Sequence, residues 1–487
     1  MLPSSARQPR LWEAFLPLLI LILFLILNVY LFEDSATSGP NQLALIFASI
    51  SAAFIGIRLG YTWEQIQEGI LKSINASLPA ILILLVIGAL SGTWMISGVV
   101  PTMIYYGLKI LHPSYFLVAA VLICAIVSLA TGSSWSTIAT VGVALLGIGS
   151  VMGISEGMIA GAIISGAYFG DKMSPLSDTT NLAPAMAGTD MFTHIRYMFY
   201  TTIPTLIITL IIFGFIGVFN TNVSSEAGVH DLMISLENKF TISPFLFLVP
   251  CSVFVLIYLK VSALPALIAG TFFGAIAAYI AQPDLINELA PNSSSYTQSS
   301  YKAIVLAMSG ETSFVTENET MNKLLTTRGM FGMLNTIWLI LCAMSFGGAM
   351  EISGLLNKIT NVIIKKVKST GGLIASTAGT CVFFNATASD QYLAIVVPGR
   401  MYANVFKEKG LKPENLSRTI EDSGTVTSVL FPWNTCGAAQ ASVLHVATGS
   451  YWMYCFFNLI SPVTTIVYGY MNFKIRKYSS EEQNSIG

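Results

Sequence analysis

The run GDKMSPLSDTTN at residues 170–181 decides the fold, because it inserts two aspartates, a lysine and a proline between two apolar segments. An apolar run at 157–170 leads into it, and apolar residues resume after it. A stretch this polar cannot pack as a helix against lipid, and Pro175 removes an amide donor and clashes with the preceding turn. The pattern predicts a helix that breaks at membrane depth, where its unwound backbone must face protein or water.

The rest of the chain has the composition of a membrane protein. Of its 487 residues, 54% are apolar and only 10% are charged, whereas soluble domains are about 25% charged. Apolar runs near the ~20 residues needed to cross a bilayer recur from end to end. We therefore expect a single all-α polytopic transport domain over 1–487 with about ten full crossings. A formal net charge of -1 without a long basic run excludes a nucleic-acid partner.

The positions of Lys and Arg predict the orientation, because short cytoplasmic loops retain these residues. Basic residues before the first apolar run, at 11–32, and after the last one place both termini in the cytoplasm. The first run is too long for a signal-peptide core of ~7 to 15 residues, so it reads as a retained span. The largely acidic segment 283–329 is expected as an external loop, and Lys260 is expected on the inner side.

The chain contains an internal repeat with an offset of 256 residues. The offset aligns Ile96-Ser97-Gly98 with Ile352-Ser353-Gly354, Ala130-Thr131 with Ala386-Thr387, and Asp178-Thr179 with Asn434-Thr435. The charge pattern puts the two copies on opposite membrane faces, so we expect inverted repeats at 74–219 and 330–471. Inverted repeats are common in secondary transporters, whose substrate site lies at the repeat interface near mid-bilayer.

Each half also has an apolar run of about 16 residues, a polar tip and a second apolar run. We interpret these as two re-entrant hairpins, with an ordinary turn between two crossings as the alternative. The polar tips carry Ser133 and Ser134 in the first half and Asp390 in the second. A second broken helix is predicted at FPWNTCG, residues 431–437, around Pro432.

Asp178 is the strongest candidate for ion chemistry. A charged residue inside a membrane costs roughly 2.5 to 3.5 kcal/mol on insertion scales, so it is a functional candidate by default. Hydroxyls and an amide surround Asp178, and oxygen ligands suit a hard cation such as Na+. Desolvation raises a carboxyl pKa and a bound cation lowers it, so a single aspartate shielded from water can hold H+ or Na+ in turn. The alternative is a solvated loop acid.

The predicted cation and proton site draws on both tips and both breaks. Its members are Asp178, Thr179, Asn181, Ser133, Ser134, Asp390, Asn434 and Thr435. Asp178, Thr179, Ser134 and Asn434 are the expected Na+ ligands. Asp171, Glu421 and Asp422 form a candidate proton route; Asp171 can equally pair with Lys172, and the other two can compensate a helix dipole. We expect no cofactor besides the transported ion and no catalytic residue.

The runs at 170–183, 131–135 and 431–434 resemble the signature of the NhaC-type Na+/H+ antiporter family, and the similarity extends over roughly residues 10–475. The resemblance implies a multi-pass transporter of the bacterial cytoplasmic membrane, with inverted repeats, re-entrant hairpins and broken helices, commonly as a homodimer. The family also includes malate/lactate antiporters and amino-acid carriers, so the resemblance does not fix the cargo.

These observations favour Na+/H+ antiport with Asp178 as the shared ion site. The alternative is Na+- or H+-coupled exchange of a small organic acid, of the malate/lactate type, or of an amino acid. Near the breaks Lys172 stands alone, and a diacid would need paired cations, which favours the inorganic exchange. A third hypothesis, an intramembrane aspartyl protease, lacks its GxGD motif, because Tyr168-Phe169-Gly170 precedes Asp171. The sequence therefore indicates a transporter and no enzyme.

Overall fold

The structure is a computed structural model that describes residues 7–479, apart from 33–35, 37, 220–225, 292, 315–321, 323–324, 365–366 and 368. Within these residues the elements are helices, and the β contacts are two isolated bridges. Eight of the helices are long and apolar enough to cross a membrane, or nine if one sharply bent pair counts as a span. The predicted all-α polytopic class is confirmed, with fewer candidate spans than the ten expected.

Along the chain, the described helices form three groups. Two N-terminal helices, α1 (Leu11–Phe32) and α2 (Pro40–Leu59), precede the first group. That group comprises α3 (Trp63–Ile96), α4 (Val99–Ile110), α5 (Pro113–Thr131), α6 (Ser134–Thr137), the π-helical turn η2 (Ile138–Gly142), α7 (Val143–Val151), α8 (Glu156–Met173), α9 (Asp178–Ala187) and α10 (Met191–Phe219). The central group comprises α11 (Glu226–Lys239), η3 (Pro244–Phe247), α12 (Leu248–Tyr258), α13 (Ala263–Ala281), α14 (Pro283–Leu289) and α15 (Tyr296–Ser309).

The third group begins at η4 (Phe331–Met333) and ends near the C-terminus. It comprises α17 (Leu334–Ile352), α18 (Leu355–Ile364), α19 (Thr370–Thr387), α20 (Gln391–Glu408), α21 (Pro413–Ile420), η5 (Glu421–Thr425), η6 (Ser428–Leu430), α22 (Thr435–Leu444), α23 (Thr448–Tyr451), η7 (Trp452–Tyr454) and α24 (Phe456–Tyr470). The segment predicted as an external loop at 283–329 therefore includes two helices, and α15 packs against α3.

Helix ends recur at the offset found in the sequence. Helices α3 and α17 end at Ile96 and Ile352, and α5 and α19 end at Thr131 and Thr387; each pair is 256 residues apart. The two arms of the first hairpin, Pro113–Thr131 and Ser134–Val151, are each long and apolar enough to cross a membrane. Whether the hairpins are re-entrant, and whether the repeats are inverted, stay predictions.

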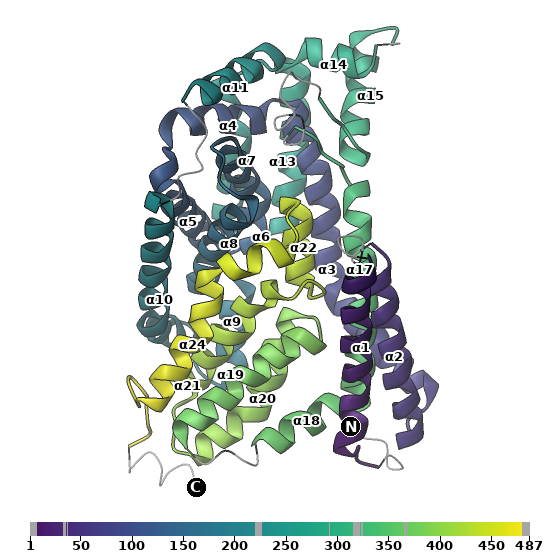
Figure 1. The fold of residues 1–487 in the computed structure, drawn as a ribbon, viewed down its shortest axis with the longest axis vertical. Helices are drawn as coiled ribbons and strands as arrows, with labels where there is room; N and C mark the ends of the chain where they lie inside the picture. Colours follow the sequence, from purple (N-terminus) through teal and green to yellow (C-terminus); the bar gives the residue numbers. More distant parts are fainter. Residues whose placement is uncertain are drawn as a thin grey trace.

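The helices form two packed sets (Figure 1). Helices α1, α2, α3 and α17 lie side by side, and α13 and α15 also pack on α3. The second set joins α5, α8, α10 and α24, with α19, α20 and α21 packed beside them. The start of α1 and the end of α24 lie toward the same end of the molecule, opposite α11 and α14 (Figure 1).

Close contact between α5 and α8 depends on glycine. A Cβ atom on Gly166 would lie 2.2 Å from the carbonyl oxygen of Val121, and one on Gly170 would lie 2.4 Å from the amide nitrogen of Leu129. Small residues let helix backbones approach this closely, which is how helices gain packing energy inside a membrane. The approach fixes α8, whose last residues enter the site, against α5, which leads to the first hairpin tip.

Gly166→Ala should therefore destabilise the protein by about 1 to 3 kcal/mol through overpacking. Thermal unfolding in detergent, followed by loss of monodisperse protein, measures the effect. Gly379→Ala in α19 is the matched control, because its new Cβ would meet nothing within 4 Å. Equal melting temperatures for the two variants would contradict the close packing of α5 and α8.

Candidate functional site

The first hairpin tip rests on the first helix break. Helix α5 ends at Thr131, and Gly132 has φ +68°, a conformation that favours glycine. A Cβ on Gly132 would also lie 2.7 Å from the backbone carbonyl carbon of Leu176. Ser133 then caps α6, because its hydroxyl accepts a hydrogen bond from the amide of Ser136. The tip and the break are therefore in direct backbone contact.

The first break is narrower than the sequence indicated. Helix α8 continues to Met173 and α9 begins at Asp178, so residues 174–177 alone are non-helical. The hydroxyl of Thr180 donates to the carbonyls of Asp171 and Lys172 at 3.1 and 3.0 Å. The amide of Asn181 donates to the carbonyls of residues 175 and 177. These opened carbonyls thus have partners inside the protein.

Asp171 joins the tip to the break. Its carboxylate accepts hydrogen bonds from the amide and hydroxyl of Ser134, at 3.2 and 2.6 Å, and from the hydroxyl of Ser177 at 2.6 Å. The side chain is 7% exposed. It does not pair with its neighbour Lys172, which instead forms an ion pair with Asp422. The suggested self-neutralising pair of residues 171 and 172 is therefore wrong.

The second half repeats the arrangement with different polar groups. Asp390 caps α20 and accepts from the amide of Leu393 at 2.9 Å. After η6 the chain is non-helical until Asn434, which caps α22 by accepting from the amide of Cys436 at 3.0 Å. The Asn434 amide donates to the carbonyl of Asn385 at 3.0 Å. Asn434 is fully buried and its polar groups are already bonded.

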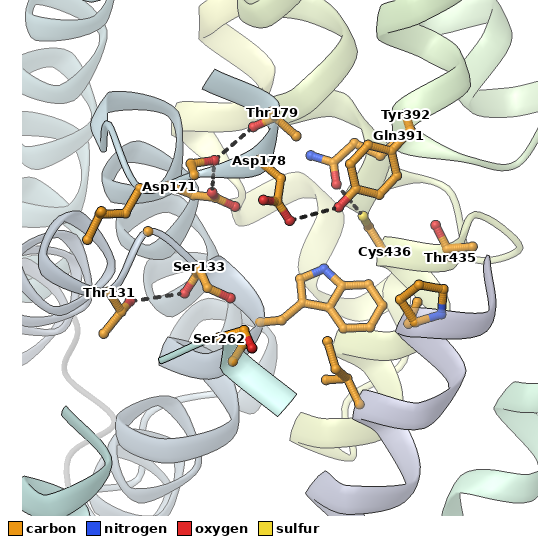
Figure 2. Close-up of a pocket in the computed structure, with 18 of the residues that line it drawn as sticks. Thr131, Ser133, Asp171, Asp178, Thr179, Ser262, Gln391, Tyr392, Thr435 and Cys436 are labelled. Carbon is orange, nitrogen blue, oxygen red and sulfur yellow. Dashed lines mark hydrogen bonds between the residues drawn. The ribbon is translucent and has the colours of Figure 1, made fainter. Parts of the chain in front are cut away.

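Both tips and both breaks meet at one cavity of about 650 Å³ (Figure 2). Its wall includes the first tip (Thr131, Gly132, Ser133), the first break (Ser177, Asp178, Thr179), the second tip (Asp390, Gln391, Tyr392) and the second break (Thr435, Cys436). Helix α3 and the turn between α12 and α13 complete it. Segments that are far apart in the sequence are thus brought to one place.

Asp178 projects into this cavity. Figure 2 shows its carboxylate and the Tyr392 hydroxyl of the other half pointing toward each other, and they are 3.5 Å apart. Asp178 is exposed, and it is the first residue of α9. The expectation that it is shielded from water in an unwound stretch is therefore wrong for this structure. The buried acid of the first break is Asp171, which also lines the cavity but is only 7% exposed.

The other predicted site residues divide into two sets. Ser133, Thr179, Asp390 and Thr435 line the cavity together with Asp178. Ser134, Asn181 and Asn434 lie outside the lining and are engaged in hydrogen bonds that hold the tip and the breaks. Glu421 and Asp422 are fully buried in η5.

Sequence reasoning missed several lining residues, above all Lys260. It sits at the turn between α12 and α13 with φ +64°, and it lines the cavity. Its expected position on the inner side stays a prediction. Gln391, Tyr392 and Cys436 were also missed; the Cys436 thiol lies 3.0 Å from the Gln391 side-chain oxygen. Gln391 and Tyr392 directly follow Asp390, and Cys436 lies in the second break, so their sequence positions could have identified these three. No feature of the sequence indicated that Lys260 lines the cavity.

The lining is acidic on balance. Its charged side chains are Asp171, Asp178, Asp390 and Lys260. Acidic clefts concentrate cations, and the carboxylates and hydroxyls present are ligands that hard cations prefer. Among the described residues there is no cluster of three His, Cys, Asp or Glu that could hold a resident metal ion.

The described part of the chain is thus an all-helical protein with several candidate membrane spans and one cavity where both tips and both breaks meet. The model of the Na+/H+ antiporter family matches residues 166–473. The chain belongs to this family, as the sequence resemblance indicated.

Three relatives cover nearly the whole chain. The Na+/H+ antiporter NhaC of Alkalihalophilus pseudofirmus is 35% identical, over 90% of this chain and 92% of its own. The malate-2H+/Na+-lactate antiporter of Bacillus subtilis is 37% identical, over 96% of both chains. The arginine/ornithine antiporter ArcD of Halobacterium salinarum is 34% identical, over 98% of this chain and 95% of its own. Relatives of similar identity therefore differ in cargo.

The geometry predicts unequal effects on stability for the two aspartates of the first break. Asp171→Asn should destabilise the protein by about 1 to 3 kcal/mol, because an amide nitrogen replaces one acceptor and faces a serine hydroxyl. Asp178→Asn should change stability by less than about 0.5 kcal/mol, because the side chain is exposed. Thermal unfolding of the purified variants tests this. A larger loss for Asp178→Asn than for Asp171→Asn would contradict the assigned roles.

Proposed function

We propose that the protein exchanges Na+ for H+ across the cytoplasmic membrane, with Asp178 as the carboxylate that binds the cation. The observation that carries the proposal is the position of Asp178, which projects into the cavity where both tips and both breaks meet. The family match and the NhaC relatives support the exchange. The acidic lining supports a cationic cargo.

Asp178 is free to coordinate an ion. Among the described residues its hydrogen-bond partner is the Tyr392 hydroxyl, at the long distance of 3.5 Å. A Na+ ion could keep part of its hydration shell in the open cavity and take the rest of its ligands from the carboxylate and from hydroxyls such as those of Ser133 and Thr435. Asp171 serves as a positioning residue, since its oxygens already accept three hydrogen bonds.

The same proposal covers the setting of the protein. Both termini would face the cytoplasm, since the start of α1 and the end of α24 lie toward one end of the molecule and carry the basic residues. The two halves would be inverted repeats that alternate access to the cavity, supported by helix ends 256 residues apart. A homodimer in the bilayer and the absence of enzymatic activity complete the proposal; the named relatives are antiporters.

Everted membrane vesicles that contain the protein should lose an imposed pH gradient when Na+ is added. Asp178→Asn should raise the Na+ concentration needed for half-maximal exchange about tenfold or more, because it removes a carboxylate interaction with Na+ worth ~1.4 kcal/mol or more. A pH-sensitive dye measures the exchange. Asp190→Asn is the matched control, since Asp190 is exposed and lies outside the cavity lining. Full exchange by Asp178→Asn would contradict the proposed cation site.

A second candidate function is exchange of a small organic acid. The cavity of about 650 Å³ is far larger than a metal ion, and Lys260 supplies a cation that a carboxylate could bind. The malate/lactate antiporter among the relatives supports this reading. The acidic balance of the lining is the reason that Na+/H+ exchange stays the first proposal.

Proteoliposomes loaded with unlabelled malate or lactate distinguish the two candidates. If the cargo is organic, labelled acid should enter in exchange, and Lys260→Ala should reduce this uptake because the cavity loses its cation. Exposed Lys409→Ala serves as the control. Na+-driven proton movement without any added acid, together with no acid uptake, would reject this second candidate.

A further inference from the structure

A buried charged cluster lies behind the cavity wall, between α8 and η5. The ammonium group of Lys172 pairs with the carboxylate of Asp422, and both side chains are fully buried. The Ser461 hydroxyl lies 3.2 Å from the Lys172 ammonium nitrogen, and the Thr201 hydroxyl donates to Asp422 at 3.2 Å. The pair therefore connects a helix of the first half with a segment 250 residues later in the chain.

Glu421, the neighbour of Asp422, is fully buried but has no such partner. Its side chain is 0% exposed, and among the described residues neither carboxyl oxygen has a hydrogen-bond partner. An ionised carboxylate left alone in this way would cost far more than a neutral group, so a lone buried acid is held in its protonated form. Glu421 is thus a carboxyl group that the fold keeps neutral while it lies beside a charge pair.

A count of charges leads to the same result. Three acids, Asp171, Glu421 and Asp422, lie around the buried cation Lys172, and a second buried cation, Arg418, stacks on the Tyr197 ring. Lys172 neutralises Asp422, and three donated hydrogen bonds stabilise Asp171 as a carboxylate. Glu421 alone has neither kind of support. Of the three acids, Glu421 is therefore the one that protonation stabilises most.

Helices α9, α19, α20, α21 and α24 pack around η5, the segment that contains Glu421. Helix α24 contributes no acidic or basic side chain. The buried or cavity-lining charged and thiol groups around η5 are Asp171 and Lys172 of α8, Asp178 of α9, Cys381 of α19, Asp390 at the cap of α20, and Glu414 and Arg418 of α21. Lys407 and Glu408 of α20 are exposed. Arg418 stacks on the Tyr197 ring, Arg400 is exposed, and the two acids of α9 and α20 line the cavity. Lys172 acts electrostatically on Glu421, whereas the Arg418 guanidinium is held on the Tyr197 ring.

We propose that Glu421 carries the proton of the exchange, at a site separate from Asp178, which carries the cation. The inference rests on the proposed function. Loss of the proton from the Glu421 carboxyl to water would leave a carboxylate that competes with Asp422 for Lys172. Because Lys172 follows Asp171 directly in α8, this change would reach the residue that fastens the first tip to the first break. The two ions would then influence each other without sharing a carboxylate.

Transport by purified protein in proteoliposomes tests the separation of the two sites. Glu421→Gln should abolish Na+-driven proton movement, yet it should retain exchange of labelled for unlabelled Na+, which moves no net charge or proton. Asp178→Asn should weaken both activities about tenfold or more. Glu68→Gln, at an exposed glutamate, is the matched control. Persistent proton movement in Glu421→Gln, or loss of Na+/Na+ exchange together with it, would overturn the inference.

An infrared measurement tests Glu421 independently of the cargo. At neutral pH the wild-type protein should show the carbonyl-stretch band of a protonated carboxyl group, and Glu421→Gln should lose a band that Glu68→Gln keeps. Because a neutral amide then replaces a neutral acid, Glu421→Gln should also fold and melt close to the wild type. An unchanged spectrum or a misfolded variant would overturn the assignment. If the wild type shows the band but does not exchange Na+ for H+, the result would reject the proposed function alone.

Discussion

The hydrogen bonds to the Asp171 carboxylate are the interaction on which the rest of the site depends. Ser134 belongs to the tip after α5, and Ser177 belongs to the break between α8 and α9. Hydrogen bonds to a charged group contribute roughly 1.5 to 3 kcal/mol each. They hold the tip against the break, and the backbone contact at Gly132 leaves no room for a side chain between them. Asp178 owes its place at the cavity wall to this junction.

The two halves use equivalent positions differently. Asp178 and Asn434 are related by the 256-residue offset, yet the first projects into the cavity and the second is buried as the cap of α22. The second half contributes Asp390 at its tip and Tyr392 opposite Asp178. Similar backbone geometry thus places unlike polar groups on the two sides of one cavity, which gives the cavity a preferred charge without opposing carboxylates from both breaks.

Much of this arrangement could be predicted from residue types. The polar run at 170–181 and the tip around Ser133 indicated where the membrane helices are interrupted, and the repeat related them to Asp390 and Asn434. The exposure of the individual aspartate side chains could not be predicted in the same way. Whether Asp171 or Asp178 is the exposed aspartate depends on where α8 ends and α9 begins, and a shift of a few residues in a helix end reverses the result.

Long-range pairings were also beyond the sequence. Lys172 and Asp422 are 250 residues apart, and each taken alone is compatible with a solvated loop or a helix terminus. Lys260 was assigned to the inner face because the charge rule assumes that a turn between apolar runs lies at a membrane surface. The sequence did not indicate that the turn between α12 and α13 also reaches the cavity, because this position depends on packing against neighbouring helices.

Equilibrium binding of radioactive Na+ to the purified protein tests the central claim, a cation site in the cavity at Asp178, most directly. The account predicts saturable Na+ binding that weakens as pH falls. Asp178→Asn should lose this binding, and Asp190→Asn should retain it. Saturable Na+ binding of unchanged affinity in Asp178→Asn would contradict the account.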